Sequence, residues 1–369
     1  MTASDFRSLL KRFGVLAALL FAASLPAQAA GRSEPGAVYA LTNSAGGNAV
    51  IAWHRSADGS LSPAGTFPTG GAGTGAGLGS QDAVVVSKDR RFLLAVNAGS
   101  NSVSSFRIED HGGLSYVDTV DSGGAMPTSI ALRGSLVYVL NAGVPNNVSG
   151  FHLADSGALT PIADSARPLS ADSTAPGQVG FSRDGDTLIV TERGTNRIDT
   201  YLVNDDGTLH GPFVFPSAGP TPFGFASAQR NTLLVSEAGA GGGASTYRVD
   251  DGDLRPVSAM VMTGQRAACW AMVTPNGRFG YVTNAGTGNI SGVAIGSDGS
   301  ARLLNEDGVT ALTGGNPTDM AMSRDGHYLY ARVAALGQIA AFRVQADGSL
   351  APLPALTGTP AGLAGLAGY

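Results

Sequence analysis

The stretch APGQVGFSRDGDTLIVTERGTNRIDTYLVNDDGTL, residues 175–209, holds one complete unit of a repeat that runs through the chain. In it, VGFS is a short apolar strand, RDGD is a tight turn and TLIVTE is a second strand. RGTN then forms a loop, RIDTYLV alternates as a third strand, and the Asp-Gly of NDDGTL turns the chain toward a fourth. Four short antiparallel strands in succession predict one blade of a β-propeller.

The Asp-Gly turn marks seven copies of this unit. Its glycine recurs at intervals of 45 to 53 residues, at Gly59, Gly112, Gly157, Gly207, Gly252, Gly299 and Gly348. Fifteen or sixteen residues before each glycine, the second strand ends at a matching position, namely Asn43, Asn97, Asn141, Glu192, Glu237, Asn284 and Val333. A repeat of this length, made of strand-length apolar runs without helical periodicity, predicts an all-β, seven-bladed β-propeller with four-stranded antiparallel blades.

The first copy lacks one strand. Copies two to seven each begin with an inner strand led by a turn residue, whereas the first begins directly at the second strand, AVYALTN. The missing strand appears at the other end of the chain as Thr359 to Leu366, TPAGLAGL, which has the same Pro and small-apolar alternation as Pro317 to Met322. We therefore expect the C-terminal strand to close the ring, which removes open sheet edges.

Composition agrees with one closed domain over residues 30–369. The repeat phase is unbroken, so it leaves no place for a domain boundary. Charged residues make up 14% of the chain, against roughly a quarter in typical domains, and 53 residues are glycine. This composition is expected when most residues lie in turns or in strands buried between blades.

The first 29 residues predict a secretory signal peptide. Arg7, Lys11 and Arg12 precede the apolar run Phe13 to Leu25, and Ala27-Gln28-Ala29 is a small-x-small cleavage site. The apolar run is too short for a stable membrane anchor, although an uncleaved anchor is the alternative. We expect a periplasmic or secreted protein whose formal charge moves from −5 to −7 on cleavage, because three basic residues and one acidic residue are removed.

Several kinds of ligand find little support in the sequence. A mildly acidic chain with no basic patch is a poor candidate for nucleic acid. The histidines do not repeat with metal-ligand spacing, so we expect no metal or other cofactor. A calcium site built from the carboxylates of Asp82, Glu192, Glu237 and Asp319 is the alternative. Cys269 predicts a buried thiol, and the Gly-rich runs 70–79 and 239–243 predict flexible loops.

Candidate ligand-binding residues gather at one end of the central channel. In a four-stranded antiparallel blade, the start of the first strand meets the end of the second at one face. The inner strands bring there the candidate substrate-binding residues Asp82, Gln178, Phe223, Trp270 and Asp319. The second strands bring Glu192 and Glu237, with Arg193, Arg197 and Arg266 in nearby loops. This mouth of the channel is the natural ligand site of a propeller.

Three of these residues are candidates for catalysis. Glu192 and Glu237 would each act as a general base or substrate clamp, or would cap backbone N–H groups of the following loop, as the asparagines of the equivalent blades can. Arg197 carries a guanidinium suited to a carboxylate or phosphate, or it is a solvated loop charge. Modest desolvation beside Phe223 and Trp270 would raise the pKa of a glutamate toward neutrality.

At Pro176 to Ile198, and again at Gly219 to Glu237, the sequence resembles the seven-bladed lactonase family of 6-phosphogluconolactonases and 3-carboxy-cis,cis-muconate lactonizing enzymes. That family has an aromatic-Ser-Pro-Asp-Gly turn, a strand, an acidic residue, a glycine and an arginine before an aliphatic residue. The matching residues here are Phe181, Ser182, Asp184, Gly185, Glu192, Gly194, Arg197 and Ile198.

The resemblance also marks what this chain lacks. The family's His after Pro is Gly177, its Arg-His pair is Thr221 and Pro222, and its Arg in the last blade is Thr318. Together with the predicted export, the resemblance implies an enzyme that hydrolyses or closes a sugar or organic-acid lactone that is less charged than the family's phosphorylated or polycarboxylate substrates. The alternative is a non-catalytic propeller that binds a ligand or a protein partner.

Overall fold

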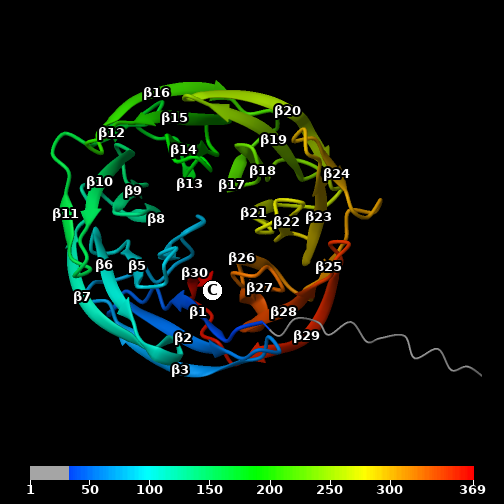
Figure 1. Cartoon of the computed structure of the whole chain (residues 1–369), viewed down its shortest axis with the longest axis horizontal. Helices are drawn as coiled ribbons and strands as arrows, with labels where there is room; N and C mark the ends of the chain where they lie inside the picture. The colour runs from blue at the N-terminus through cyan, green and yellow to red at the C-terminus, as the bar shows by residue number, and fades with distance from the viewer. Residues whose placement is uncertain (1–32) are drawn as a thin grey trace, which may run out of the picture. The chain divides into compact units, whose positions relative to one another are not determined.

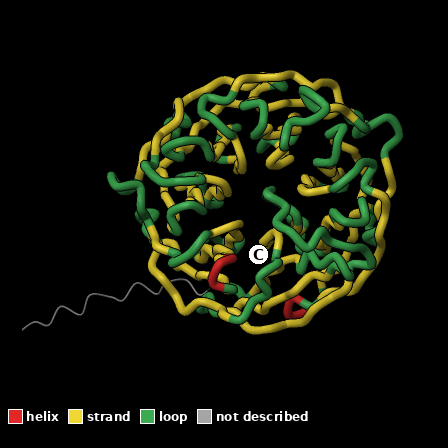
Figure 2. The backbone as a smooth tube through the Cα atoms, turned by 180° about the vertical axis from the view of Figure 1, so that it is seen from behind, coloured by secondary structure: helices red, strands yellow, loops and turns green. Residues whose placement is uncertain are grey.

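The computed structural model describes residues 33–369, in which seven antiparallel sheets stand around a central axis (Figure 1). This confirms the predicted all-β, seven-bladed propeller. Apart from strands, the described residues contain two short 3-10 helices, η1 (Asp110–Gly112) and η2 (Ala334–Leu336). Loops and turns join the strands at both ends of the ring (Figure 2). The predicted signal peptide lies outside the described residues.

Each blade contains four strands from the axis outward, and the outermost strand of blades 3 and 6 is interrupted. Blade 1 consists of β30 (Ala364–Gly368), β1 (Gly36–Leu41), β2 (Ala49–Arg55) and β3 (Leu61–Pro68), and blade 2 of β4 (Val84–Val86), β5 (Phe92–Asn97), β6 (Ser102–Ile108) and β7 (Leu114–Asp121). Blade 3 consists of β8 (Pro127–Arg133), β9 (Leu136–Asn141), β10 (Asn147–Leu153), β11 (Leu159–Pro161) and β12 (Arg167–Pro168), and blade 4 of β13 (Pro176–Phe181), β14 (Thr187–Glu192), β15 (Arg197–Val203) and β16 (Leu209–Pro216). Blade 5 consists of β17 (Pro222–Ser227), β18 (Thr232–Glu237), β19 (Gly243–Asp250) and β20 (Asp253–Met262). Blade 6 consists of β21 (Ala268–Val273), β22 (Phe279–Asn284), β23 (Asn289–Ile295), β24 (Ala301–Leu303) and β25 (Ala311–Leu312). Blade 7 consists of β26 (Pro317–Met322), β27 (Tyr328–Val333), β28 (Gln338–Val344) and β29 (Leu350–Thr357).

The core lies between neighbouring blades. The second strands β5, β14, β18 and β22 are buried at every residue, because both of their faces are covered by adjacent blades. This explains why they read as continuous apolar runs and not as an alternating pattern. Between blades 3 and 4, for example, Tyr138 and Leu140 pack with Leu188 and Val190. The domain therefore consists of seven interfaces that repeat around the ring.

The Asp-Gly turns dock each blade onto the preceding one. All seven turn glycines have a positive φ, between 78° and 93°, which favours glycine. In five of the seven turns the glycine carbonyl accepts a hydrogen bond from a hydroxyl of the preceding blade. The donor and acceptor residues are Ser105 and Gly157, Tyr138 and Gly207, Thr200 and Gly252, Tyr281 and Gly348, and Tyr330 and Gly59, at donor–acceptor distances of 2.5 to 2.8 Å.

The ring is closed by β30, as expected. It pairs antiparallel with β1, where Val38 lies opposite Gly368 and Leu41 lies opposite Ala364. The closing strand begins five residues later and ends two residues later than the predicted Thr359 to Leu366, because Pro360 has no N–H group and Gly358 turns the chain with a φ of 78°. Arg55 secures this end through a hydrogen bond of 3.1 Å from Nε to the carbonyl of Tyr369.

No helix among residues 33–369 has the length and apolar content needed to cross a membrane.

Truncating the chain before Thr359 should lower the melting temperature markedly. The deletion removes β30 and the residue before it, and with them Leu363 and Leu366, which are only 1% and 3% exposed. Burial of each such side chain stabilises a fold by about 1.5–3 kcal/mol, and the loss also opens the edge of β1. Thermal unfolding followed by circular dichroism measures the effect, with Pro360→Ala in the full chain as control. An unchanged melting temperature in the truncated chain would refute closure by β30.

Candidate functional site

The predicted mouth of the channel is closed by a segment of the chain itself. Residues 78–82, which we call the plug, end the long connection between β3 and β4 and cross the channel. Ser80 Oγ donates to the carbonyl of Thr128 in blade 3 at 2.7 Å, and Gln81 N donates to the carbonyl of Gly177 in blade 4 at 3.1 Å. On the far side, Trp270 Nε1 of blade 6 donates to the carbonyl of Ser80 at 2.9 Å.

The side chain of Gln81 completes this closure. Its Nε2 donates to the carbonyl of Ala271 at 2.8 Å, and its Oε1 accepts from Ala271 N at 3.0 Å. The carboxamide thus pairs with the backbone of β21 as another strand residue would. Gln81 is 4% exposed, so this polar group is buried with its partners satisfied.

The Gly-rich run before the plug has defined contacts, although the sequence predicts a flexible loop. Asn43, at the end of β1, accepts a hydrogen bond of 3.0 Å from Thr74 N and donates one of 2.5 Å to the carbonyl of Ala76. Gly73 and Gly99 lie where a side chain would overlap backbone atoms of the neighbouring loops. Glycine is therefore needed here for close packing of backbone segments as well as for turns.

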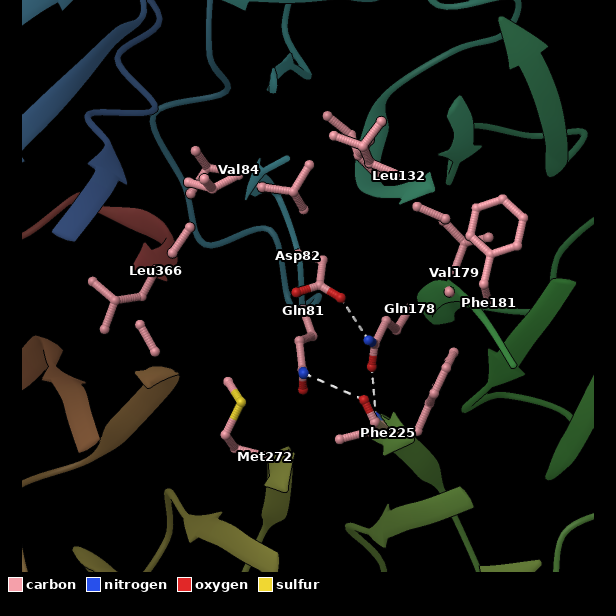
Figure 3. Close-up of a pocket in the computed structure, with 18 of the residues that line it drawn as sticks. Gln81, Asp82, Val84, Leu132, Gln178, Val179, Phe181, Phe225, Met272 and Leu366 are labelled. Atoms are coloured by element: carbon pink, nitrogen blue, oxygen red, sulfur yellow. Dashed lines mark hydrogen bonds between the residues drawn. The ribbon is translucent and has the colours of Figure 1, made fainter. Parts of the chain in front are cut away.

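Beyond the plug, the channel is an open cavity of about 410 Å³ lined by all seven inner strands. Most of the lining side chains are apolar, among them Val84, Ile130, Val179, Phe225, Met272 and Leu366. Gln81, Asp82 and Gln178 form its polar end (Figure 3). The remaining lining residues come from the middle and end of each inner strand. The cavity thus extends toward the face of the Asp-Gly turns, opposite the mouth that the sequence predicts.

Asp82 carries the ionisable group in this cavity. Its Oδ2 accepts a hydrogen bond of 2.6 Å from Gln178 Nε2, and Gln178 Oε1 accepts one of 2.5 Å from Phe225 N (Figure 3). Burial raises the pKa of Asp82 to about 7, against the opposing effect of the Gln178 hydrogen bond. The structure therefore brings together two of the predicted substrate-binding residues, and it orients the carboxyl group of one of them by the amide of the other.

Asp319 lies behind this site and is not part of the cavity lining. It is 2% exposed, and its Oδ1 accepts a hydrogen bond of 2.8 Å from Met320 N. Burial raises its pKa well above the usual value, and the nearby charge of Asp82 raises it further. The backbone of Asp82 and of Asp319 has a positive φ, 63° and 109° respectively. Strained backbone of this kind costs about 1–3 kcal/mol per residue and is typical of functional sites.

Phe223 and Trp270 lie on the plugged side of the channel. Their ring centroids are 4.9 Å apart, and the guanidinium of Arg193 lies 5.0 Å from the Phe223 centroid. Arg193 Nε also donates to the carbonyl of Ala175 at 3.0 Å. Arg193, four residues before the predicted Arg197, therefore brings a cation to this mouth. Arg197 is exposed at the start of β15, the third strand of its blade.

Glu192 and Glu237 are buried inside their blades, and neither lines the cavity. Glu192 Oε1 accepts from Ser170 N at 3.0 Å, and Oε2 accepts from the Ser170 hydroxyl at 2.5 Å. Glu237 Oε1 accepts from the Ser217 hydroxyl at 2.8 Å. Both serines lie in the loop that leads into the inner strand of the same blade. Both glutamates thus accept hydrogen bonds from the loop before the inner strand, whereas the sequence suggested capping of the following loop, and only Glu192 accepts one from a backbone N–H of its serine.

Burial shifts the pKa of Glu237 and of Asp199, an acid that lies beside Glu192. Burial raises the pKa of Glu237 to about 7, opposed by its hydrogen bond from Ser217. Burial also raises the pKa of Asp199 to about 8, and the neighbouring Glu192 adds to the rise. Among residues 33–369, no group of three or more His, Cys, Asp or Glu side chains is arranged to hold a metal ion. The four carboxylates of the alternative calcium site do not lie together, because Glu192 and Glu237 are in the interiors of two different blades.

Gln81 is the residue of this site that sequence reasoning did not select, whereas Arg193 was placed in a loop near the mouth but was not chosen as a candidate. Gln81 follows a Gly-rich run, so no strand pattern indicates where its side chain lies. Two signals were available. Ser80-Gln81-Asp82 is a polar run directly before an inner strand, and Gly224 occupies a strand position where glycine usually marks a close approach.

The sequence is similar to known seven-bladed propellers. The family profile described as "Lactonase, 7-bladed beta-propeller" matches residues 46–169 and 236–364. The 6-phosphogluconolactonase of Bacillus subtilis (strain 168) is 23% identical over 302 residues, which cover 77% of this chain and 86% of that protein.

Solved structures have the same architecture. The periplasmic gluconolactonase of Pseudomonas aeruginosa aligns with a TM-score of 0.71 and 19% identity, over 88% of this chain and 98% of that chain. A protein from Lactobacillus plantarum aligns with a TM-score of 0.74 and 16% identity, over 90% and 99% of the two chains. At these identities the likeness is one of fold.

Thermal stability should fall as the pH rises from about 5 to about 8. A carboxyl group whose pKa is raised by folding stabilises the folded state fully below its unfolded pKa of about 4, and this contribution is lost as the pH rises through the folded value. Asp82 and Glu237, with pKa values of about 7, and Asp199, at about 8, act in this sense.

Melting temperatures measured across this range provide the test. Glu237→Gln should flatten the slope, since a neutral amide does not titrate. Asp206→Asn is a control, because the pKa of this exposed turn carboxylate is lowered by Thr208, which places its effect below pH 4. A slope that is unchanged by Glu237→Gln would contradict the raised pKa.

Proposed function

Because this chain belongs to the lactonase family of seven-bladed β-propellers, we propose that it hydrolyses an uncharged lactone in the central cavity. The observation that carries the proposal is the position of Asp82 at the polar end of an apolar cavity, with a pKa of about 7. A general base works best when its pKa is near the working pH, because it is then both ionised and basic. Gln178 would hold the carboxylate in one orientation.

The reaction needs no group beyond these and water. Asp82 takes a proton from a water molecule, and the water oxygen attacks the lactone carbonyl carbon. The ring C–O bond of the tetrahedral intermediate then breaks, and the leaving alkoxide receives the proton from Asp82. The product is the open hydroxy acid. Its carboxylate is poorly solvated in an apolar cavity beside an acidic group, which favours release.

The lining of the cavity supports an uncharged substrate. Among its described lining residues there is no lysine, arginine or histidine. A phosphate or a second carboxylate would therefore lose its hydration without gaining a cation, which is unfavourable. This argues against the phosphorylated substrates and the polycarboxylate cyclisation found elsewhere in the family. The similar Pseudomonas aeruginosa protein is named a periplasmic gluconolactonase, a name that includes no phosphate.

The catalytic roles expected for Glu192, Arg197 and Glu237 stay predictions. Both glutamates accept hydrogen bonds from serines of their own blade, and Arg197 lies on a third strand. These contacts support structural roles for the glutamates, so we assign the general base to Asp82. The two assignments make opposite predictions for substitution.

Asp82→Asn should lower kcat/KM for a hydrolysed lactone by about 10²- to 10⁴-fold, the usual contribution of a general base. The measurement is acid release from a panel of uncharged and phosphorylated lactones. The rate of the unsubstituted protein should rise with pH and level off above about 7, since the base acts when it is deprotonated.

Glu237→Gln is the matched control, because Glu237 is also a buried acid with a pKa of about 7 but lies outside the cavity. It should leave turnover within a few-fold of the unsubstituted protein. Loss of activity in Glu237→Gln or Arg197→Ala, with Asp82→Asn still active, would overturn the cavity assignment and support the residues expected from the sequence.

A binding propeller without catalysis is the second candidate. It is favoured by the plug, which fills the mouth where the family's His and Arg positions would stand, and by Gly177, Thr221, Pro222 and Thr318 at those positions. Propellers commonly act as rigid platforms, so fold alone does not choose. If no lactone in the panel is hydrolysed, the result supports a non-catalytic propeller that binds a small molecule or a protein partner.

We also propose that the protein is exported, with a mature chain that begins near Ala30. The basic, apolar and small-residue order of residues 1–29 supports this. N-terminal sequencing of the protein purified from its native cells should begin near Ala30, in a periplasmic or secreted fraction. An intact Met1 in the cytoplasmic fraction would be the contrary result.

A further inference from the structure

The plug is fitted into the ring by a steric match between Gln81 and Gly224. A Cβ atom at Gly224 would overlap Gln81 Oε1 and would lie 2.8 Å from the carbonyl oxygen of Cys269. Gly224 lies in β17 and is not among the glycines with positive φ, so its backbone does not require glycine. The space is occupied by the carboxamide of a residue that lies 143 positions earlier in the chain, and it is bounded by the backbone of Cys269 and Ala271.

Gln81 also forms the closed end of the cavity. Its backbone N–H is held by blade 4 and its carboxamide by blade 6, so the side chain spans the channel between them. Asp82 and Gln178 lie beside this span and face the cavity (Figure 3). A ligand that enters from the face of the Asp-Gly turns therefore meets Gln81 at the end of its path.

We propose that Gln81 is the specificity-determining residue that limits the length of ligand the cavity accepts. Ligands then enter and leave through the same opening, on the side away from the family's usual mouth. This proposal rests on the cavity being the ligand site, as in the proposed function, and does not depend on lactone hydrolysis.

A homologous series of straight-chain 1-alkanols, from butanol to decanol, tests this limit in the full chain. Binding is measured by the rise in melting temperature at increasing alcohol concentration. Affinity should increase about fourfold for each CH₂ group buried in the apolar lining, until the chain reaches Gln81 and the gain stops. In Gln81→Ala the gain should continue for about two further carbons, because the side chain that ends the cavity has been shortened.

Gln81→Met is the matched control. Methionine has nearly the same length and volume but cannot pair with the backbone of Ala271, so it should lower stability while the alcohol length limit stays in place. If Gln81→Ala does not unfold cooperatively, Gln81→Asn replaces it, since it keeps the amide and is shorter by one CH₂ group. An unchanged length limit in the folded, shortened variant would overturn the proposal.

A double-mutant cycle tests the steric match separately. Gly224→Ala should lower the melting temperature more in the unsubstituted protein than in Gln81→Ala, where the carboxamide no longer fills the space. Equal decreases in melting temperature in the two backgrounds would show that Gly224 does not make room for the side chain of Gln81. A shifted alcohol limit without turnover of any lactone would support the proposal while the enzymatic function fails.

Discussion

The ring depends on a contact that is repeated between neighbouring blades, in which a hydroxyl group of one blade donates to the glycine carbonyl of an Asp-Gly turn in the next. Tyr138, Tyr281 and Tyr330 make it through phenol groups that are otherwise buried in the core. A buried phenol without a partner would be costly, so the tyrosines and the turns specify each other. The glycines are needed for their positive φ and for their approach to side chains of the neighbouring blade, as at Gly348 beside Phe279.

The arrangement of seven blades around one axis explains why polar side chains such as Gln81 can be buried near the channel. Seven inner strands converge on the channel, and their backbone groups can satisfy a side chain that reaches them, as the backbone of Ala271 does for Gln81. Acidic groups are a different matter, since an amide partner offsets only part of their lost hydration. Asp82 keeps a raised pKa despite its bond with Gln178. The rigid ring thus keeps a carboxyl group buried at its centre although ionisation is unfavourable there, an arrangement that is common at functional sites.

The sequence predicts the fold well because the features that define it are local and repeated. Asp-Gly turns, second-strand endings and the missing first strand each leave a mark at a fixed spacing, and the seven blades and their closure followed from them. The site was harder to predict. Glu192 and Glu237 stand where other blades have asparagine, and sequence alone does not show whether such a position faces the channel or a loop serine.

The plug was the least accessible feature. It lies in a Gly-rich run without strand periodicity, and its partner Ala271 is 190 residues away. Only a complete ring brings these residues together, so no local pattern could place Gln81 in the channel. Arg193 and Arg197 were likewise indistinguishable by spacing, because the turn between β14 and β15 decides which of the two reaches the mouth.

Closure by β30 also has a consequence for biosynthesis. The strand that completes blade 1 is translated after the other twenty-nine strands of residues 33–369, so blade 1 keeps an unpaired inner edge until the ribosome has made residues 364–368. Contacts between segments this far apart in the chain form slowly, since the connecting chain must lose its conformational freedom first. The nascent polypeptide therefore stays incompletely folded through nearly all of its synthesis.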